Sequence, residues 1–130
     1  PLSTQTVLEG GEALLLSEVA DPPAQMVDSL TTLFKTLKTV KRAFLCSIKE
    51  SADAPANLLI GIEAEGDIES VIQTTGSVAT DTLPGDEPID ICQVVEGEKG
   101  ISHFMIAHIT PFYEKRWGSF LRDFKQNRII

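Results

Sequence analysis

Apolar residues recur every three or four positions between Pro23 and Lys38, which is the spacing of an amphipathic helix. Proline is tolerated in the first turn of a helix, so Asp21-Pro22-Pro23 can end a preceding strand and open this helix. The helix is predicted to run to about Lys38, with Lys35 and Lys38 largely off its apolar stripe. Its apolar positions are Met26, Val27, Leu30, Leu33, Phe34 and Leu37.

Four segments carry the apolar runs or the alternation that is typical of β-strands. They are residues 11–19, 43–49, 57–65 and 89–95. In the second and third segments every other residue is apolar, which predicts a sheet that is covered on at least one side. The alternating residues are Phe44, Cys46 and Ile48, and then Leu58, Ile60, Ile62 and Ala64.

A second, weaker amphipathic helix is predicted after the Gly66-Asp67 turn, where Asp67 is placed to act as the N-cap. Gly76 inside this helix costs about 1 kcal/mol relative to alanine, so the helix can break there. The apolar positions of the helix are Ile68, Val71, Ile72 and Ala79.

The predicted order is therefore strand, helix, strand, strand, helix, strand. This is the βαββαβ order of ferredoxin-like folds, and it predicts an α+β domain with an antiparallel sheet and both helices on one face. The other face of the sheet then needs a cover or a partner.

The end of the chain predicts two more helices, which form a C-terminal helical extension. Residues 101–109 fit a short helix, and Thr110-Pro111 ends it and can cap the next one. The last helix carries an aromatic stripe roughly 100° wide, flanked by cations that include Arg116. The aromatic stripe consists of Tyr113, Trp117, Phe120, Leu121 and Phe124.

Two interpretations of the aromatic stripe are open. In the first, it packs on the uncovered sheet face of its own domain. In the second, it docks another domain, a second copy of the chain or a partner protein. Trp, Tyr and Arg dominate the energetics of protein interfaces, so docking of another domain, a second copy or a partner protein stays open.

Charge is unevenly spread along the chain, whose formal net charge is −8. Between Glu50 and Glu98 there are twelve acidic residues and no Lys or Arg. Residues 1–110 hold six Lys and Arg against seventeen Asp and Glu, a net −11, whereas residues 111–130 hold five against two, a net +3. Such an acidic body repels phosphate backbones and anionic lipid, so neither nucleic acid nor a membrane is an expected partner.

No nucleophile elbow, phosphate-binding loop or metal-binding motif accompanies this pattern, so we expect no enzyme, no cofactor and no metal. The carboxylates around the Pro-Gly turn could collect a hard cation, but they lack the spacing of an EF-hand. They are interpreted as a solvated surface or a surface for a basic partner. These carboxylates are Asp81, Asp86, Glu87 and Asp90.

The histidines and cysteines also favour structural interpretations. His103 and His108 would lie about 140° apart on a helix, which suits joint metal ligation poorly. Cys46 and Cys92 lie in apolar strands and are predicted to be buried free thiols. A disulfide between them requires a fold that brings their two strands together.

Residues 1–130 are interpreted as a single domain, because a chain of this length can bury a real core. Residues 1–10 are expected to be a linker or an edge segment, and residues 111–130 an aromatic, basic helical tail. No signal peptide and no apolar stretch near the ~20 residues of a membrane span is present, so the cytoplasm is the expected compartment. The chain begins at Pro1 without an initiator Met, which suggests that it is part of something longer.

Three stretches carry a resemblance to a known family: NLLIGIEAEGDIE (Asn57–Glu69), TDTLPGDEPIDICQV (Thr80–Val94) and the run from Gly100 to Ile130. They resemble the C-terminal domain family of the bacterial enhanced serine sensitivity protein SseB, in its enterobacterial form. The resemblance is close from about Lys41 onward and a general pattern before it. It implies a cytoplasmic two-domain protein whose N-terminal domain is absent from this chain, and it carries over no functional residues.

Two functional hypotheses follow. The first is a non-enzymatic interaction or regulatory module that docks its missing N-terminal domain, another protein or a second copy. Its candidate interaction residues are Tyr113, Arg116, Trp117, Phe120, Leu121 and Phe124. The second is an amino-acid sensor like the ACT domains, which share the βαββαβ order and bind serine-like effectors near the first strand–helix loop. This analogy holds at the level of the fold, and the matching loop, residues 20–25, lacks the glycine that would clear space for a ligand.

Overall fold

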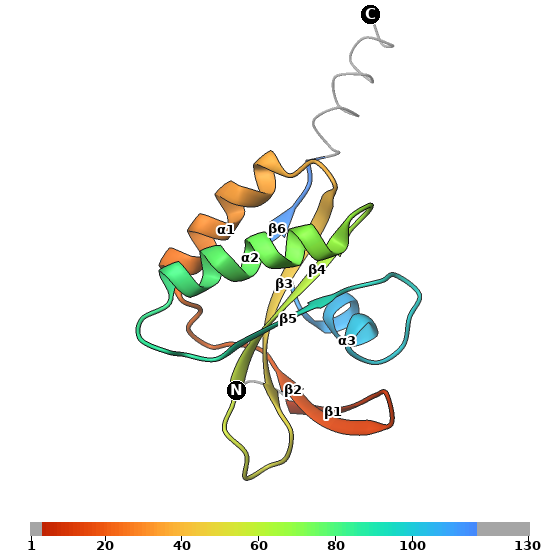
Figure 1. Cartoon of the computed structure of the whole chain (residues 1–130). Coiled ribbons are helices and arrows are strands. Elements are labelled where there is room, and N and C mark those ends of the chain that lie inside the picture. Colours follow the sequence, from red (N-terminus) through yellow and green to blue (C-terminus); the bar gives the residue numbers. More distant parts are fainter. Residues whose placement is uncertain (1–3, 117–130) are drawn as a thin grey trace, which may run out of the picture.

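The computed structural model describes residues 4–116, which form one six-stranded sheet and three helices (Figure 1). The α+β class predicted from the sequence is confirmed. In chain order the elements are β1 (Thr4–Glu9), β2 (Glu12–Ser17), α1 (Ala24–Thr36), β3 (Val40–Lys49), β4 (Asn57–Ala64), α2 (Ile68–Thr82), β5 (Ile89–Gln93), α3 (Ile101–His108) and β6 (Tyr113–Glu114).

The strands lie in the order β1-β2-β3-β4-β5, and β6 also pairs with β3. All neighbours are antiparallel except β4 and β5, which are parallel and are connected by α2. In a split βαβ unit another strand lies between the two parallel strands that the helix connects. Here β4 and β5 are direct neighbours, and α1 connects the antiparallel neighbours β2 and β3. The ferredoxin-like order expected from the sequence is therefore not found.

The N-terminal hairpin accounts for this difference. β1, expected to be a linker or an edge segment, pairs with β2 along all six of its residues. Gly10 and Gly11 connect the two strands with φ values of 58° and 85°, the left-handed conformation that tight hairpin turns require. The other edge of β2 pairs with the end of β3. Both edges of β2 are occupied, so β2 cannot lie between β4 and β5.

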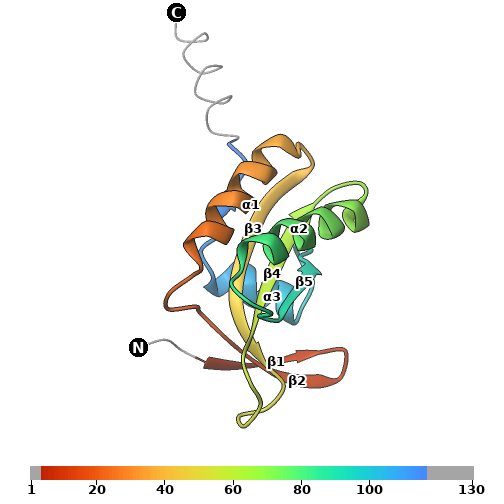
Figure 2. The same cartoon turned by 60° about the vertical axis from the view of Figure 1, so that its left-hand side comes forward.

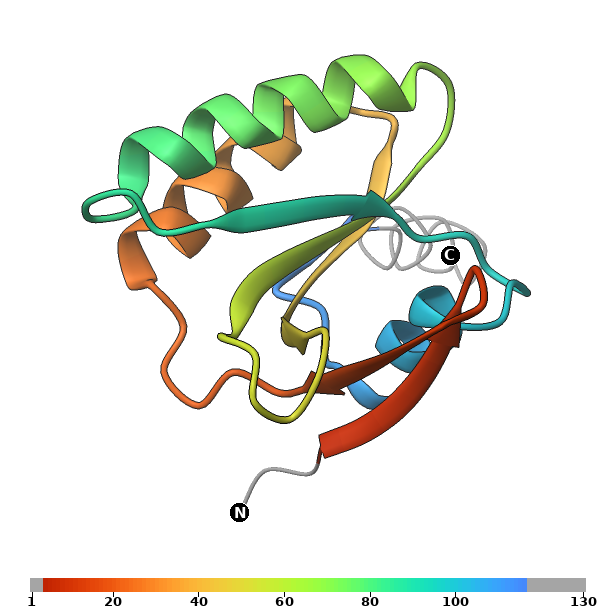
Figure 3. The same ribbon diagram turned by 60° about the horizontal axis from the view of Figure 1, so that its bottom comes forward.

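One face of the sheet is covered by α1 and α2, which lie side by side as predicted (Figure 3). Met26, Leu30 and Phe34 of α1 are fully buried in this layer. Each such side chain contributes roughly 1.5–3 kcal/mol relative to an exposed one. α2 continues through Gly76 without a break, and the Asp67 side chain caps it by accepting a 3.2 Å hydrogen bond from Ser70 N.

The opposite face, which the sequence pattern left without a cover, is covered by α3 (Figure 3). Phe104 and Met105 of α3 are buried in a cluster with Phe44 of β3 and Leu59 of β4. Gly61 of β4 lets α3 approach closely, because a Cβ there would overlap Met105 Sδ.

The β1–β2 hairpin and the C-terminal end of α1 lie at opposite ends of the molecule (Figure 2). The hairpin contacts α3 through Glu9, whose Oε1 accepts a 2.9 Å hydrogen bond from Ile101 N. Leu8, the neighbour of Glu9, is the one large hydrophobic residue among residues 4–116 that is exposed, and 70% of its surface is accessible.

Candidate functional site

The two-residue strand β6 brings the beginning of the C-terminal segment onto the sheet. Phe112 N donates a 2.9 Å hydrogen bond to Ala43 O, and Lys115 N donates a 2.7 Å bond to Lys41 O. β2 pairs only with residues 47–49 of β3, so the earlier part of that edge is open to β6.

Tyr113 therefore lies in a strand, and the prediction that it begins a helical stripe is wrong. The unpaired edge of β3 supplies backbone hydrogen-bond partners, which a 3.6-residue periodicity in the sequence does not reveal. Trp117, Phe120, Leu121 and Phe124, the rest of the aromatic stripe, lie outside the described residues. Whether they form a helix and what they contact stay predictions.

Tyr113 and Phe112 are half-buried against the core of their own chain. Their ring centroids lie 5.7 Å and 6.2 Å from that of Phe34 in α1. Both therefore pack on the α1 side of the sheet, and α3 covers the other side. Tyr113 is the one residue of the aromatic stripe that the structure describes, and it packs within its own chain. It lies on the sheet face that α1 and α2 cover, not on the opposite face where the first interpretation placed the stripe.

A groove of about 450 Å³, here called the basic groove, lies between α1 and the β6 segment. Thr31 and Lys35 come from α1, and Lys38 lies in the turn directly after it. Residues 112–116 supply the opposite side and include Lys115 and Arg116. The sequence placed the lysines off the apolar stripe of α1, but it held no signal that they would meet cations almost eighty positions further along the chain.

The cations of the basic groove are only partly compensated. Lys115 Nζ donates a 2.7 Å hydrogen bond to Lys38 O, just beyond the C-terminal end of α1. Cations are favourable at such a helix end, but the dipole there amounts to only about half an elementary charge. Glu114 is the one carboxylate among the described lining residues. Within residues 4–116, neither Lys35 nor Lys38 forms an ion pair.

The neighbouring cations of β3 are bound differently. Lys41 pairs with Glu65 at 2.9 Å, and Arg42 Nε donates to Glu63 Oε1 at 2.6 Å. These hydrogen bonds raise the pKa of both Lys41 and Arg42. The Arg42 guanidinium also lies 5.5 Å from the ring centroid of Phe44. Lys41 and Arg42 therefore each form a structural ion pair with a glutamate of the same domain. The basic groove, in contrast, is lined by four cations and one carboxylate.

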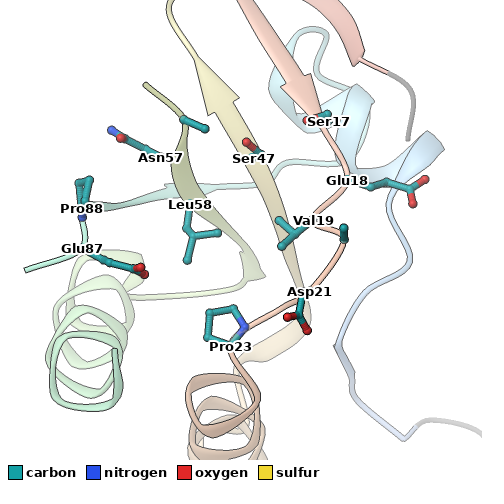
Figure 4. A pocket seen from close by; sticks show the side chains of 12 residues that line it. Ser17, Glu18, Val19, Asp21, Pro23, Ser47, Asn57, Leu58, Glu87 and Pro88 are labelled. Atoms are coloured by element: carbon teal, nitrogen blue, oxygen red, sulfur yellow. The ribbon is translucent and has the colours of Figure 1, made fainter. Parts of the chain in front are cut away.

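A second cavity, of about 530 Å³, lies at the β2–α1 loop, the loop that the ACT comparison singled out (Figure 4). Its walls also include Ser47 at the end of β3 and Asn57 at the start of β4. The carboxylates of Glu18, Asp21 and Glu87 approach it from different sides and do not converge on one point (Figure 4). No Lys or Arg of the described chain lines this cavity.

The other candidate residues are not brought together into a site. Asp81, Asp86, Glu87 and Asp90 are exposed, and Asp90 Oδ2 accepts a 3.4 Å hydrogen bond from Asn57 Nδ2. Nowhere in residues 4–116 do three or more His, Cys, Asp or Glu side chains come together in a way that could hold a metal ion. No described helix has the length and apolar character to cross a membrane.

His103 and His108 are exposed on α3, with the ring of His108 lying 5.5 Å from that of Phe104. Cys46 and Cys92 are free thiols, as predicted, but only Cys46 is buried, whereas Cys92 is half-buried. Because β4 lies between their strands, the two backbones are separated by two strand spacings, about 9.6 Å. This exceeds the ~7 Å limit for a disulfide.

Comparisons with a family model and with individual known proteins point to the same family. The family described as SseB protein C-terminal domain matches residues 8–115. The chain is 79% identical over all of its 130 residues to Protein SseB of Escherichia coli (strain K12) and, equally, to Protein SseB of Shigella flexneri. It covers 50% of each relative, so it spans about half their length. No solved structure gives a significant match to the chain.

Proposed function

The chain belongs to the SseB C-terminal domain family, and we propose that it is a non-enzymatic protein-interaction module. Its docking surface is the basic groove together with the C-terminal segment that begins at β6. Its partner is the remaining half of a longer SseB-type protein, or another protein.

The observation that carries the proposal is the concentration of cations around half-buried aromatic rings at one end of an acidic molecule. Lys35, Lys38 and Arg116 are exposed beside Phe112 and Tyr113. Arginine and aromatic residues are enriched in interfaces, and complementary charge steers the encounter between partners. The relatives are about twice as long as this chain, so each has a further half that such a surface could dock.

Site-directed photo-crosslinking in living bacteria tests this function. A photoreactive amino acid replaces Arg116 or Trp117 in one set of proteins and Leu8, at the opposite end of the molecule, in the control. We expect positions 116 and 117 to give one discrete adduct, identified by mass spectrometry as the same protein in both cases. In the Trp117→Ala/Phe120→Ala background, the adduct from position 116 should decrease strongly.

The proposal fails if positions 116 and 117 give no discrete adduct. It also fails if the adducts from Leu8 match those from the basic end, because the contact would then not be specific to this surface.

Amino-acid binding is the second candidate, and one observation favours it: the 530 Å³ cavity lies at the β2–α1 loop. Serine carries both an ammonium and a carboxylate group. Asp21 and Glu87 would suit the ammonium group, whereas the first turn of α1 is the only described positive element near the carboxylate. A ligand that binds the native state raises the melting temperature, so millimolar serine should do so. An unchanged melting temperature with serine and related amino acids would exclude this candidate.

A further inference from the structure

We propose that the basic groove binds an extended, acidic segment of a partner protein that carries at least one apolar side chain. This inference rests on the interaction function proposed above and specifies the chemistry of the partner.

Charge is the first argument. Residues 4–116 contain eight Lys and Arg, and four of them line the basic groove. Two of the others, Lys41 and Arg42, are held by Glu65 and Glu63. Four cations thus line the groove against one carboxylate, Glu114, although Glu65 also interacts electrostatically with Lys115. An acidic ligand is attracted there and repelled by the acidic body of residues 1–110.

The shape and composition of the groove are the second argument. Its volume of about 450 Å³ lies within the range of ligand sites, and Phe112 and Tyr113 give it apolar walls. Their rings are held against Phe34, so an apolar side chain of the partner would meet a surface that is already ordered. Such preorganisation lowers the entropic cost of binding.

The position of β6 favours an extended segment. Within the described sheet, β6 pairs with β3 alone, so its second edge carries no strand. An exposed strand edge binds extended peptides through main-chain hydrogen bonds. Lys35 and Lys38, from α1 and the turn after it, on one side and Lys115 and Arg116 on the other would then flank the bound chain.

Two other occupants fit less well. A second copy of this chain presents its acidic residues between 50 and 98 mainly on β4, α2, β5 and the turns between them, not as a free extended segment. A nucleic acid would bring many phosphates close to a body with a net charge of −11, whereas a short peptide can be confined to the groove.

Fluorescence anisotropy with a labelled ten-residue peptide of Glu and Asp with a central Leu tests the inference. The same peptide with Gln and Asn in place of the acids serves as the uncharged probe. We expect the acidic peptide to bind the full chain and to lose roughly tenfold in affinity between about 0.05 and about 0.3 M salt. The uncharged peptide should bind at least about tenfold more weakly.

Matched charge reversals locate the binding. The Lys35→Glu/Lys38→Glu variant should lower the affinity by roughly tenfold or more, whereas Lys49→Glu/Lys99→Glu should change it by less than about twofold. Both variants alter the net charge equally; Lys35, Lys38 and Lys99 are exposed, and Lys49 is half-buried at the end of β3. Their melting temperatures show that any loss of binding is not a loss of folding.

Several results would overturn the inference. The inference fails if the acidic peptide does not bind, or if both double variants lower its affinity equally. It also fails if a single-stranded oligonucleotide of the same charge binds more tightly than the peptide, or if the chain self-associates and Lys35→Glu/Lys38→Glu abolishes that self-association. If the peptide does not bind while positions 116 and 117 still crosslink one protein, the interaction function stands and only the acidic chemistry of its partner is rejected.

Discussion

Gly61 is the residue at which the packing of α3 tolerates the least change. A Cβ at this position would overlap Met105 Sδ and lie 2.7 Å from Val94 Cγ2, and both neighbours are buried. The sequence pattern alone treated Gly61 as an ordinary position in an alternating strand. Its role depends on a helix forty residues later, which is why it was not recognised.

Gly61→Ala is expected to lower the free energy of unfolding by about 1–3 kcal/mol, because overpacking forces α3 away from the sheet. Gly76→Ala is the matched control. In α2 its Cβ would meet Ile91 Cδ1 at an ordinary 3.5 Å, and alanine favours the helix, so stability should rise by up to about 1 kcal/mol. Urea denaturation of both variants measures the difference, and a neutral Gly61→Ala would contradict the close approach of α3.

Cys46 and Cys92 show how burial changes the chemistry of a side chain. Burial is the main cause that raises the pKa of Cys46 to about 12 and that of Cys92 to about 11, from a usual value of 9.0. Folded thiols with such pKa values stay protonated at neutral pH, so neither is a reactive nucleophile.

The same shifts predict an alkaline loss of stability. Between about pH 9 and 11 the unfolded chain releases thiol protons that the folded chain keeps, so the free energy of unfolding falls as the pH rises. Each thiol contributes up to about 1.4 kcal/mol per pH unit in this window. The free energy of unfolding, measured by denaturation at pH values from 8 to about 10.5, should therefore fall less steeply with pH for Cys46→Ala/Cys92→Ala than for the parent. If the free energy of unfolding depends on pH in the same way for the variant and the parent, the pKa values of the two thiols are not raised in the folded protein.

At the scale of elements, α3 depends on a residue from the other end of the chain. Ile101 N, at the first position of α3, donates to Glu9 Oε1 at the tip of the β1–β2 hairpin. Gly100 has φ +80°, and a Cβ there would lie 2.6 Å from the same oxygen. A carboxylate at a helix N-terminus satisfies a free N–H group and favours the helix dipole.

Glu9→Gln should therefore lower the free energy of unfolding by about 0.5–1 kcal/mol. Glu12→Gln is the control, because Glu12 lies opposite Glu9 in the hairpin and its replacement removes a like-charge neighbour. That variant should be neutral or slightly stabilising. Equal losses in the two variants, measured by urea denaturation, would show that the contact with α3 has no special role.

β6 shows why one element was assigned to the wrong class. The spacing of Tyr113 and the aromatic residues after it is helical, and no local signal opposes it. The edge of β3 that β2 leaves open determines the outcome, since two main-chain hydrogen bonds hold the segment there. A pairing between residues seventy positions apart is not encoded in local periodicity.

At the scale of the whole molecule, the net charge of −8 is a source of self-repulsion in the compact state. Raising the salt concentration from about 0.02 to about 0.3 M should therefore raise the melting temperature. Lys35→Glu/Lys38→Glu and Lys49→Glu/Lys99→Glu are each four units more negative, so both should show a larger rise than the parent. Circular dichroism melts measure this effect, and a rise confined to one double variant would assign it to local contacts.

The sequence by itself determined the class of the domain, the four main strands, the three helices and the acidic character of the body. Periodicity and caps are local properties, so Met26, Leu30 and Phe34 could be placed on the buried face of α1 and Asp67 at the N-cap of α2. Only the tertiary structure decided the strand order, the cover that α3 provides and the convergence of Lys35 and Lys38 with Lys115 and Arg116 in the basic groove. These features depend on which strand edges remain free to pair and on contacts between distant segments, and neither leaves a periodic trace along the chain.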